Sequence, residues 1–337
     1  MKALVYSALK TLEMRDVAEP EIGPGEVKIK VAATGICGSD VHGFLGHSAR
    51  RQPGLILGHE TCGVVVEGDD NAVGRRFSVN PLITCGLCGA CRAGRHNCCR
   101  TWRLLGMDTL HGGFSDYVVV PRRNIYPLPD SVRDAAAVMI EPLANAFHIL
   151  SMIPPTAGLL PHVAILGGGT LGACILSVAG ARGLQVVAVS EPNPLRAGVA
   201  KALGATTVVD PTTDDMVAEV MTRTHGVGVS VAIDAVGTAE TRNAAASMVA
   251  KGGTALLLGL DQGPTTFDFF DLVRREVRLQ TSFAYTEHDF AAAHHFVESG
   301  AVDFSPWTDI LNLDQGQAAF ERLIQNPGDR IKIALVP

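Results

Sequence analysis

Cysteines with short, regular spacing dominate one segment of the sequence. Cys85, Cys88, Cys91 and Cys99 follow the pattern C-x2-C-x2-C-x7-C, and five of the eight cysteines lie between positions 85 and 99. Four thiolates at such spacings can surround one Zn²⁺ ion tetrahedrally, and short loops limit the entropy lost when the ligands come together. Because four sulfurs leave no open position on the metal, the spacing predicts a structural zinc site.

Two other interpretations of this cluster stay open. Four cysteines at related spacings also bind iron–sulfur clusters, and zinc ribbons occur in proteins that bind nucleic acid. Cys98 adjoins Cys99, but adjacent side chains usually point apart, so we expect Cys99 to be the fourth ligand. The formal net charge is -6, with no long block of Lys or Arg. We therefore expect no nucleic-acid partner, which would need a concentrated basic face.

A glycine turn gives a second chemical signal. The segment Gly167-Gly168-Gly169-Thr170-Leu171-Gly172 fits G-x-G-x-x-G and lies between an apolar run and an Ala-rich segment. Gly167 allows a tight turn, Gly169 allows the backbone to approach a pyrophosphate, and Gly172 allows a helix to pack closely on a strand. A helix that starts at Thr170 and Leu171 offers free N–H groups to phosphates. The turn therefore predicts a dinucleotide-binding site, although a glycine turn can also serve only to pack a helix on a sheet.

An acid after the next expected strand bears on which dinucleotide binds. Glu191 lies where a carboxylate usually binds the ribose hydroxyls, and it would repel a 2'-phosphate. No Arg or Lys follows it until Arg196, which we also count among the cofactor-binding candidates. The pattern favours NAD over NADP.

A third group of residues has the side-chain types of a catalytic metal site. Cys37, Ser39 and His42 lie within one short segment, His59 and Glu60 are adjacent, and Glu141 precedes Pro-Leu-Ala. Taken singly, each has an ordinary structural explanation: a core thiol, a core histidine whose hydrogen bonds are satisfied, or a surface carboxylate.

Their order along the chain is more specific than any one of them. Cys37-Gly-Ser-Asp-x-His42, Gly-His59-Glu60, the four-cysteine segment, Glu141-Pro-Leu-Ala, the glycine turn and Glu191 follow one another. The chain resembles the medium-chain zinc-dependent alcohol dehydrogenase superfamily over essentially its whole length. The most similar branch contains the polyol, butanediol and threonine dehydrogenases. One departure is Ala284, which stands where sorbitol-type relatives have an arginine, and this puts a sugar-alcohol substrate in doubt.

The resemblance implies roles for the third group. Cys37 and His59 would bind a catalytic zinc, Glu141 occupies the position of a third ligand, and Glu60 would lie beside the metal as an exchangeable ligand. Ser39 would take the proton of the alcohol, and His42 would pass it through the cofactor ribose to solvent.

The implied protein is an enzyme with two zinc ions per chain. It would transfer a hydride between a secondary or polyhydroxy alcohol and NAD(H), with a small-molecule alcohol or ketone as its partner. The alternatives are a sorbitol-like polyol dehydrogenase, a threonine-like amino-alcohol dehydrogenase, or a non-catalytic protein that binds NAD and zinc.

The expected elements indicate two domains. Residues 27–31, 61–67 and 117–121 have the composition of strands, whereas 163–166, 185–190, 229–234 and 254–258 are strands that alternate with helical segments. Such alternation predicts an α/β fold with a doubly wound parallel sheet. The resemblance adds a β-rich GroES-like catalytic domain, with the active site in a cleft against the Rossmann domain. We expect the catalytic domain at 1–145 and 286–337, the Rossmann domain at 146–285, and a homodimer or homotetramer through the sheet edge near 254–260.

The composition also bears on the cellular compartment. With 47% hydrophobic and 18% charged residues the chain is not disordered. The first ten residues lack the long apolar core of a secretory signal, so we expect a cytoplasmic protein. Residues 163–181 contain no charged side chain, but their glycines favour a buried strand, turn and helix over a membrane span.

Overall fold

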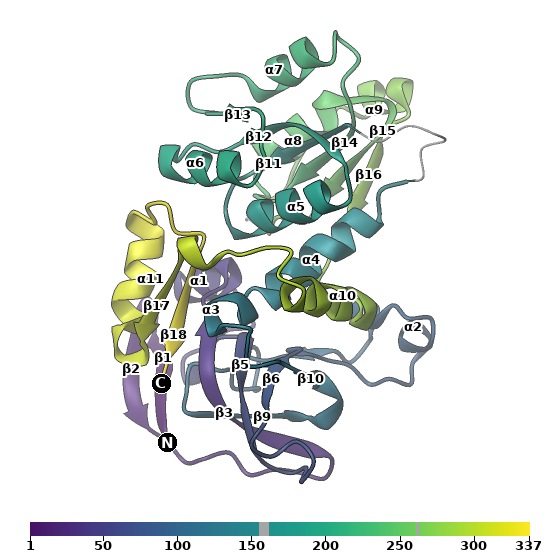
Figure 1. Ribbon diagram of the computed structural model, residues 1–337. Coiled ribbons are helices and arrows are strands. Elements are labelled where there is room, and N and C mark those ends of the chain that lie inside the picture. The colour runs from purple at the N-terminus through teal and green to yellow at the C-terminus, as the bar shows by residue number, and fades with distance from the viewer. Residues whose placement is uncertain (155–161, 261–262) are drawn as a thin grey trace. The chain divides into compact units, whose positions relative to one another are not determined.

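The computed structural model describes residues 1–154, 162–260 and 263–337, and these residues form two compact units (Figure 1). The first unit contains Met1–Ala144 and Tyr285–Pro337, and the second contains Asn145–Ala284. The chain returns to the first unit because its last strand, β18 (Lys332–Val336), pairs antiparallel with β3 (Glu26–Gly35).

The first unit is built mainly from antiparallel strands. Its largest sheet has the order β10-β6-β5-β3-β18-β17, with β9 also paired to β3, and smaller sheets have the orders β2-β1-β4 and β7-β8. The remaining strands of this unit are β1 (Lys2–Ala8), β2 (Thr11–Asp16), β4 (Leu55–Ile56), β5 (Glu60–Glu67), β6 (Arg76–Val79), β7 (Leu82–Ile83), β8 (Arg103–Leu104), β9 (Tyr117–Pro121), β10 (Ile125–Pro127) and β17 (Thr308–Asn312).

Alternating apolar residues hold the large sheet together. In β3, Val27, Ile29 and Val31 are at most 5% exposed, whereas Lys30 is exposed. This period of two places one face of the strand in the core, where it packs with Phe77 of β6. The strands expected at 27–31, 61–67 and 117–121 are confirmed.

Short helices connect these strands. They are α1 (Gly38–Phe44), α2 (Gly89–Arg92), α3 (Asp134–Ala137), α4 (Ile140–Ser151), α10 (Glu287–Glu298) and α11 (Gly316–Gln325), with 3-10 turns at η1 (His96–Cys98), η2 (Arg122–Asn124), η3 (Ser305–Trp307) and η4 (Leu313–Gln315). Helix α4 starts in the first unit and runs into the second.

The second unit is a six-stranded, fully parallel sheet (Figure 1). Its strands are β11 (His162–Leu166), β12 (Gln185–Ser190), β13 (Val208–Val209), β14 (Val229–Asp234), β15 (Val249–Leu257) and β16 (Arg278–Thr281). The order β13-β12-β11-β14-β15-β16 is the 3-2-1-4-5-6 order of the doubly wound dinucleotide-binding fold, as the alternation of elements predicted. The strand expected at 254–258 is part of β15, but the sheet edge expected near 254–260 is formed by the neighbouring strand β16, which pairs along the outer side of β15.

Helices connect the parallel strands. They are α5 (Thr170–Ala181), α6 (Pro194–Ala202), α7 (Met216–Arg223), α8 (Ala239–Met248) and α9 (Phe269–Arg275). Helix α6 is capped by the side chain of Asn193, with Pro194 in its first turn, as the sequence indicated. The central strands β11 and β14 are almost fully buried, which explains their continuous apolar sequences.

No helix in the described parts of the chain is both long and apolar enough to cross a lipid bilayer.

Candidate active site

The end of β3 and the start of α1 position the first group of candidate residues. Cys37 is the N-cap residue of α1, and its backbone N–H donates to Asp40 Oδ2 at 3.2 Å. This hydrogen bond helps to fix the first turn of the helix, which carries Ser39. His42 lies in the last turn of α1. Cys37, Ser39 and His42 are half-buried, whereas Asp40 is fully buried.

The start of β5 brings His59 and Glu60 beside this helix. Gly58 has a φ of +91°, a conformation that favours glycine, and it turns the chain into the strand. Gly35 of β3 is paired with Glu60, and a Cβ atom at Gly35 would lie 2.1 Å from Glu60 Oε2. The absence of a side chain at position 35 therefore makes room for the Glu60 carboxylate.

The structure brings together three of the expected ligands. Ligand atoms of Cys37, His59 and Glu60 all lie within 4.8 Å of one another, and His59 and Glu60 are 3% and 1% exposed. Behind them, Asp40 Oδ1 lies 3.4 Å from His59 Nδ1. A carboxylate at one ring nitrogen orients a histidine so that the other nitrogen can bind metal. One sulfur, one nitrogen and one oxygen donor, with this support, fit a catalytic zinc site.

Asp40 keeps its negative charge in spite of its burial. Burial alone raises the pKa of its carboxyl group, but the neighbouring His59 and the Arg51 guanidinium more than offset this and hold the pKa at about 2. Asp40 is therefore an ionised hydrogen-bond acceptor at neutral pH.

Glu60 is also engaged from the side of the C-terminal strand. Lys332 Nζ donates to Glu60 Oε1 at 2.7 Å and to Oε2 at 2.6 Å, and it also donates to the carbonyl oxygen of Ile36 at 3.1 Å. Both charged side chains are 1% exposed. The ion pair compensates the Glu60 charge within the protein interior.

Glu141 lies near this group without belonging to it. It is in the first turn of α4 and 8% exposed, outside the three residues whose ligand atoms lie within 4.8 Å. Burial raises the pKa of its carboxyl group, and the charge of nearby His59 lowers it in part. The fully buried Tyr285 also lies beside Glu141. Burial raises the pKa of the Tyr285 phenol, and the negative charge of Glu141 raises it further. The expected role of Glu141 as third ligand stays a prediction.

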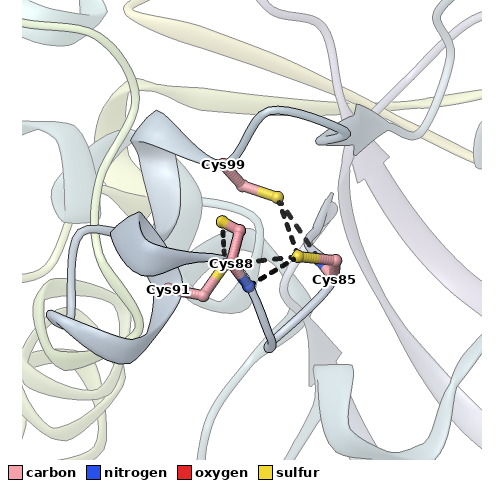
Figure 2. Close-up of side chains that lie close together, drawn as sticks. All are labelled: Cys85, Cys88, Cys91 and Cys99. Atoms are coloured by element: carbon pink, nitrogen blue, oxygen red, sulfur yellow. Dashed lines mark hydrogen bonds between the residues drawn. The ribbon is translucent and has the colours of Figure 1, made fainter.

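Figure 2 shows the four cysteines of the short-spaced segment with their sulfur atoms turned toward one another. Cys85 Sγ lies 3.9 Å from Cys91 Sγ and 3.6 Å from Cys99 Sγ, and Cys88 Sγ lies 3.6 Å from Cys91 Sγ. Four sulfurs at 2.3 Å from a tetrahedral zinc would be about 3.8 Å apart. The observed separations therefore fit zinc.

The backbone also favours thiolates at this site. The N–H groups of Leu87 and Cys88 donate to Cys85 Sγ at 3.4 and 3.3 Å, and these bonds lower the pKa of that thiol to about 6. Cys98 is exposed, and its sulfur accepts a hydrogen bond from Arg95 at 3.4 Å. It is not part of the four-sulfur group.

The glycine turn of the second unit has the geometry its sequence predicts. Gly167 has a φ of +97°, and a Cβ atom at Gly172 would lie 1.8 Å from the carbonyl oxygen of Gly167. Gly169 is the N-cap residue of α5, so Thr170 and Leu171 form the first turn. Their amides are at the end of the helix where the backbone dipole favours phosphate.

Glu191 is attached to this turn. Its Oε2 accepts from the Gly168 N–H and its Oε1 from the Asn193 N–H, both at 2.9 Å. The charge of Glu191 acts on the guanidinium of the partly buried Arg196. The two residues expected to bind the ribose end of a dinucleotide therefore lie together beside the glycine turn.

Three side chains of the first unit's site had no assigned role in the sequence interpretation: Asp40, Arg51 and Lys332. Lys332 had a usable signal, because a lysine interrupts the apolar run from Ile331 to Val336. Asp40 lies within the motif of Cys37, but only the structure shows that it faces His59. Arg51 had no recognisable pattern.

Two protein-family models match most of the chain. The model of the alcohol dehydrogenase GroES-like domain matches residues 23–130, and that of the zinc-binding dehydrogenase domain matches residues 170–299. An L-threonine 3-dehydrogenase of Pyrococcus horikoshii is 40% identical over 268 residues, which cover 77% of this chain and 76% of that protein. A sorbitol dehydrogenase of Bacillus subtilis is 31% identical over 347 residues, covering 100% and 97%.

A solved structure extends the similarity to three dimensions. A zinc-binding dehydrogenase of Sinorhizobium meliloti, bound to NADP, matches with a TM-score of 0.89 at 33% identity and covers 100% of this chain and 99% of that one. The fold and the two groups of metal-type residues thus define a zinc-binding, dinucleotide-dependent oxidoreductase. The chain belongs to the zinc-dependent medium-chain alcohol dehydrogenase superfamily. It is an enzyme that interconverts alcohols with ketones or aldehydes and uses a nicotinamide cofactor.

Proposed function

We propose that this enzyme oxidises a secondary alcohol with NAD⁺, using one catalytic and one structural zinc ion per chain. The observation that carries the proposal is the cluster of Cys37, His59 and Glu60 ligand atoms within 4.8 Å, backed by Asp40 and adjoined by Ser39 on α1. Cys37 and His59 would hold the catalytic zinc, with Glu60 or Glu141 as the carboxylate ligand. Cys85, Cys88, Cys91 and Cys99 would hold the structural zinc.

When bound, a catalytic zinc ion supplies Lewis acidity, which makes an alcohol hydroxyl easier to deprotonate. The protein's own task is to orient the ligands and to move the proton. Asp40 fixes the ring of His59, since its ionised carboxylate faces Nδ1. Ser39, half-buried on the same helix, is the first acceptor of the alcohol proton. His42, one turn further along α1, then passes the proton toward solvent.

The preference for NAD rests on Glu191. Its carboxylate is fixed beside the glycine turn by two backbone N–H groups, where it would repel a 2'-phosphate. A relative of known structure is bound to NADP, so the preference of this enzyme for NAD over NADP is tested directly. We expect wild-type enzyme to have the larger kcat/KM with NAD⁺, and Glu191→Ala to shift the ratio toward NADP⁺.

Two substrate classes compete for the proposal. A small secondary alcohol or diol fits Ala284, which offers no charged group to a polyol chain. The similarity to L-threonine 3-dehydrogenases makes an amino alcohol the second candidate. A panel with 2,3-butanediol, simple secondary alcohols, L-threonine and sorbitol, assayed by NAD⁺ and NADP⁺ reduction, separates them. The absence of turnover with every alcohol and both cofactors would overturn the proposed function.

We also propose that two copies associate through the edge of the parallel sheet. Phe269, Phe270 and Val273 of α9 are 67%, 72% and 71% exposed, and α9 directly precedes the edge strand β16. An edge strand beside an apolar surface is a ready site for pairing with a second chain. Phe270→Glu should halve the mass of the assembly in light scattering, from dimer to monomer or from tetramer to dimer. An unchanged mass would place the interface elsewhere.

A further inference from the structure

A buried guanidinium lies directly behind the proposed proton acceptor. Arg51 belongs to the loop between α1 and β4 and is 4% exposed. Its Nη2 donates to Ser39 Oγ at 3.0 Å and lies 3.5 Å from Asp40 Oδ1. Ser39 is half-buried while Arg51 and Asp40 are buried. The positive charge thus reaches the serine hydroxyl from the interior of the protein.

Helix α1 is shaped to accommodate this side chain. A Cβ atom at Gly43 would lie 2.2 Å from Arg51 Cδ and 3.0 Å from its Cβ. Gly43 does not have a positive φ, so its backbone conformation does not explain the glycine. Glycine is unfavourable inside a helix. The space that it leaves is filled by the Arg51 stem, which passes across the helix to Ser39.

The preceding arginine has different partners. Arg50 forms two-pronged contacts with Asp108, with Nε 3.0 Å from Oδ1 and Nη2 2.5 Å from Oδ2, and its guanidinium lies 4.0 Å from the centre of the Trp102 ring. Its side chain is 39% exposed. Arg50 attaches the loop to the segment at 102–108, whereas Arg51 turns inward. The adjacent residue therefore provides a matched control.

We propose that Arg51 is a positioning residue for proton transfer at Ser39, an inference that rests on the proposed function. A serine hydroxyl has one hydrogen and two lone pairs, and arginine is a donor without an acceptor. Donation from Arg51 occupies one lone pair, so Ser39 cannot direct its own hydrogen to Arg51. The second lone pair is left for the alcohol proton, and the hydroxyl hydrogen is left to pass onward.

The transfer is balanced at Ser39. During oxidation, Oγ gains the alcohol proton as its own proton leaves toward His42, so the hydroxyl ends as it began. If the Ser39 proton leaves before the alcohol proton arrives, negative charge develops on Oγ, and the fixed positive charge of Arg51 stabilises it. In the direction of ketone reduction the same two protons move in reverse, and Arg51 itself gives up none.

The test compares Arg51→Met, Arg51→Lys and the control Arg50→Met with the wild-type holoenzyme. Methionine keeps much of the length of the arginine side chain but has no charge and no hydrogen-bond donor. Lysine keeps the positive charge and can donate a hydrogen bond, but it lacks the planar guanidinium. Five quantities are measured: kcat and KM for the best alcohol, the solvent deuterium isotope effect on kcat, zinc content, and NADH affinity by fluorescence. The last two do not depend on turnover.

We expect Arg51→Met to lower kcat by about tenfold to a hundredfold, with zinc content and NADH affinity unchanged, because proton transfer becomes the slow step. Its solvent isotope effect should increase. Arg51→Lys should recover part of kcat, and Arg50→Met should resemble the wild type. In a Ser39→Ala background, Arg51→Met should change kcat by less than about twofold, since the group that it positions is gone.

Other results would overturn the inference. One is a wild-type kcat in Arg51→Met. Another is that Arg51→Met lowers kcat equally in the wild-type and Ser39→Ala backgrounds. The third is a loss of kcat that is matched by a loss of zinc. If Arg51→Met does not fold, Gly43→Ala provides the second test, because it displaces the guanidinium without removing its charge. That variant must also lower kcat and increase the isotope effect, or the inference fails. Failure of the proposed function is distinct, because the wild-type enzyme would then reduce neither NAD⁺ nor NADP⁺ with any alcohol.

Discussion

The Lys332–Glu60 ion pair gives a stability prediction that depends on three-dimensional contacts alone. Both side chains are 1% exposed, and the three hydrogen bonds of Lys332 Nζ, at 2.6, 2.7 and 3.1 Å, account for its ammonium hydrogens. Lys332→Met fills a similar space but leaves the Glu60 carboxylate buried without its partner. Breaking a buried pair from one side costs about 3–5 kcal/mol.

This free energy converts into a measurable shift. For a folded unit of this size, 1 kcal/mol corresponds to about 2–4 °C in melting temperature, so Lys332→Met should lower it by about 6–20 °C. The assay is calorimetry on metal-free protein, so that an ion beside Glu60 does not supply the missing charge.

The control and the double variant make the test specific. Lys2→Met removes an exposed lysine paired with Asp16, with side chains 62% and 76% exposed, and should have little effect. Lys332→Met combined with Glu60→Met should be less destabilised than the sum of the two single changes, because no buried charge is left alone. A shift for Lys332→Met no larger than that for Lys2→Met would show that the buried ion pair contributes no more than the exposed one.

Three further predictions concern the other sites. Gly172→Ala places a Cβ atom 1.8 Å from the Gly167 carbonyl oxygen, so the turn must shift. NADH affinity, measured by fluorescence titration, should fall about tenfold or more while zinc content stays constant. Unchanged NADH affinity would contradict the role of the turn in cofactor binding. Cys99→Ser should remove one zinc per chain and lower the melting temperature, whereas Cys98→Ser should do neither; equal behaviour of the two variants would reject the four-sulfur site. Thr286→Ala removes the side-chain cap of α10 and should cost about 1 kcal/mol, read from chemical unfolding; a value near zero would show that the cap contributes nothing.

The parallel sheet was predictable because its signals are local. The strands expected at 185–190 and 229–234 coincide with β12 and β14, and the cap at Asn193 is where the sequence placed it. Each depends on neighbours within a few positions along the chain. The predicted position of the sheet edge was wrong because the edge strand β16 (Arg278–Thr281) has only four residues and little apolar character. Only its pairing with β15 reveals it.

The site was predictable as a set of residue types, but not as a set of partners. Cys37, His59 and Glu60 come together as the motif order suggested. The contact of Lys332 with Glu60 spans 272 positions, and no local pattern contains it. Arg51 follows an identical residue, Arg50, and only the fold shows that one faces Asp108 and the other Ser39.

We propose that Cys37 belongs to a catalytic zinc site separate from the four-cysteine site. Zinc per chain, measured by mass spectrometry on wild type and Cys37→Ser and set beside NAD⁺ reduction by the best alcohol, tests it most directly. We expect the two zinc ions per chain to fall to one, with turnover lost. Two zinc ions and normal turnover in Cys37→Ser would contradict it.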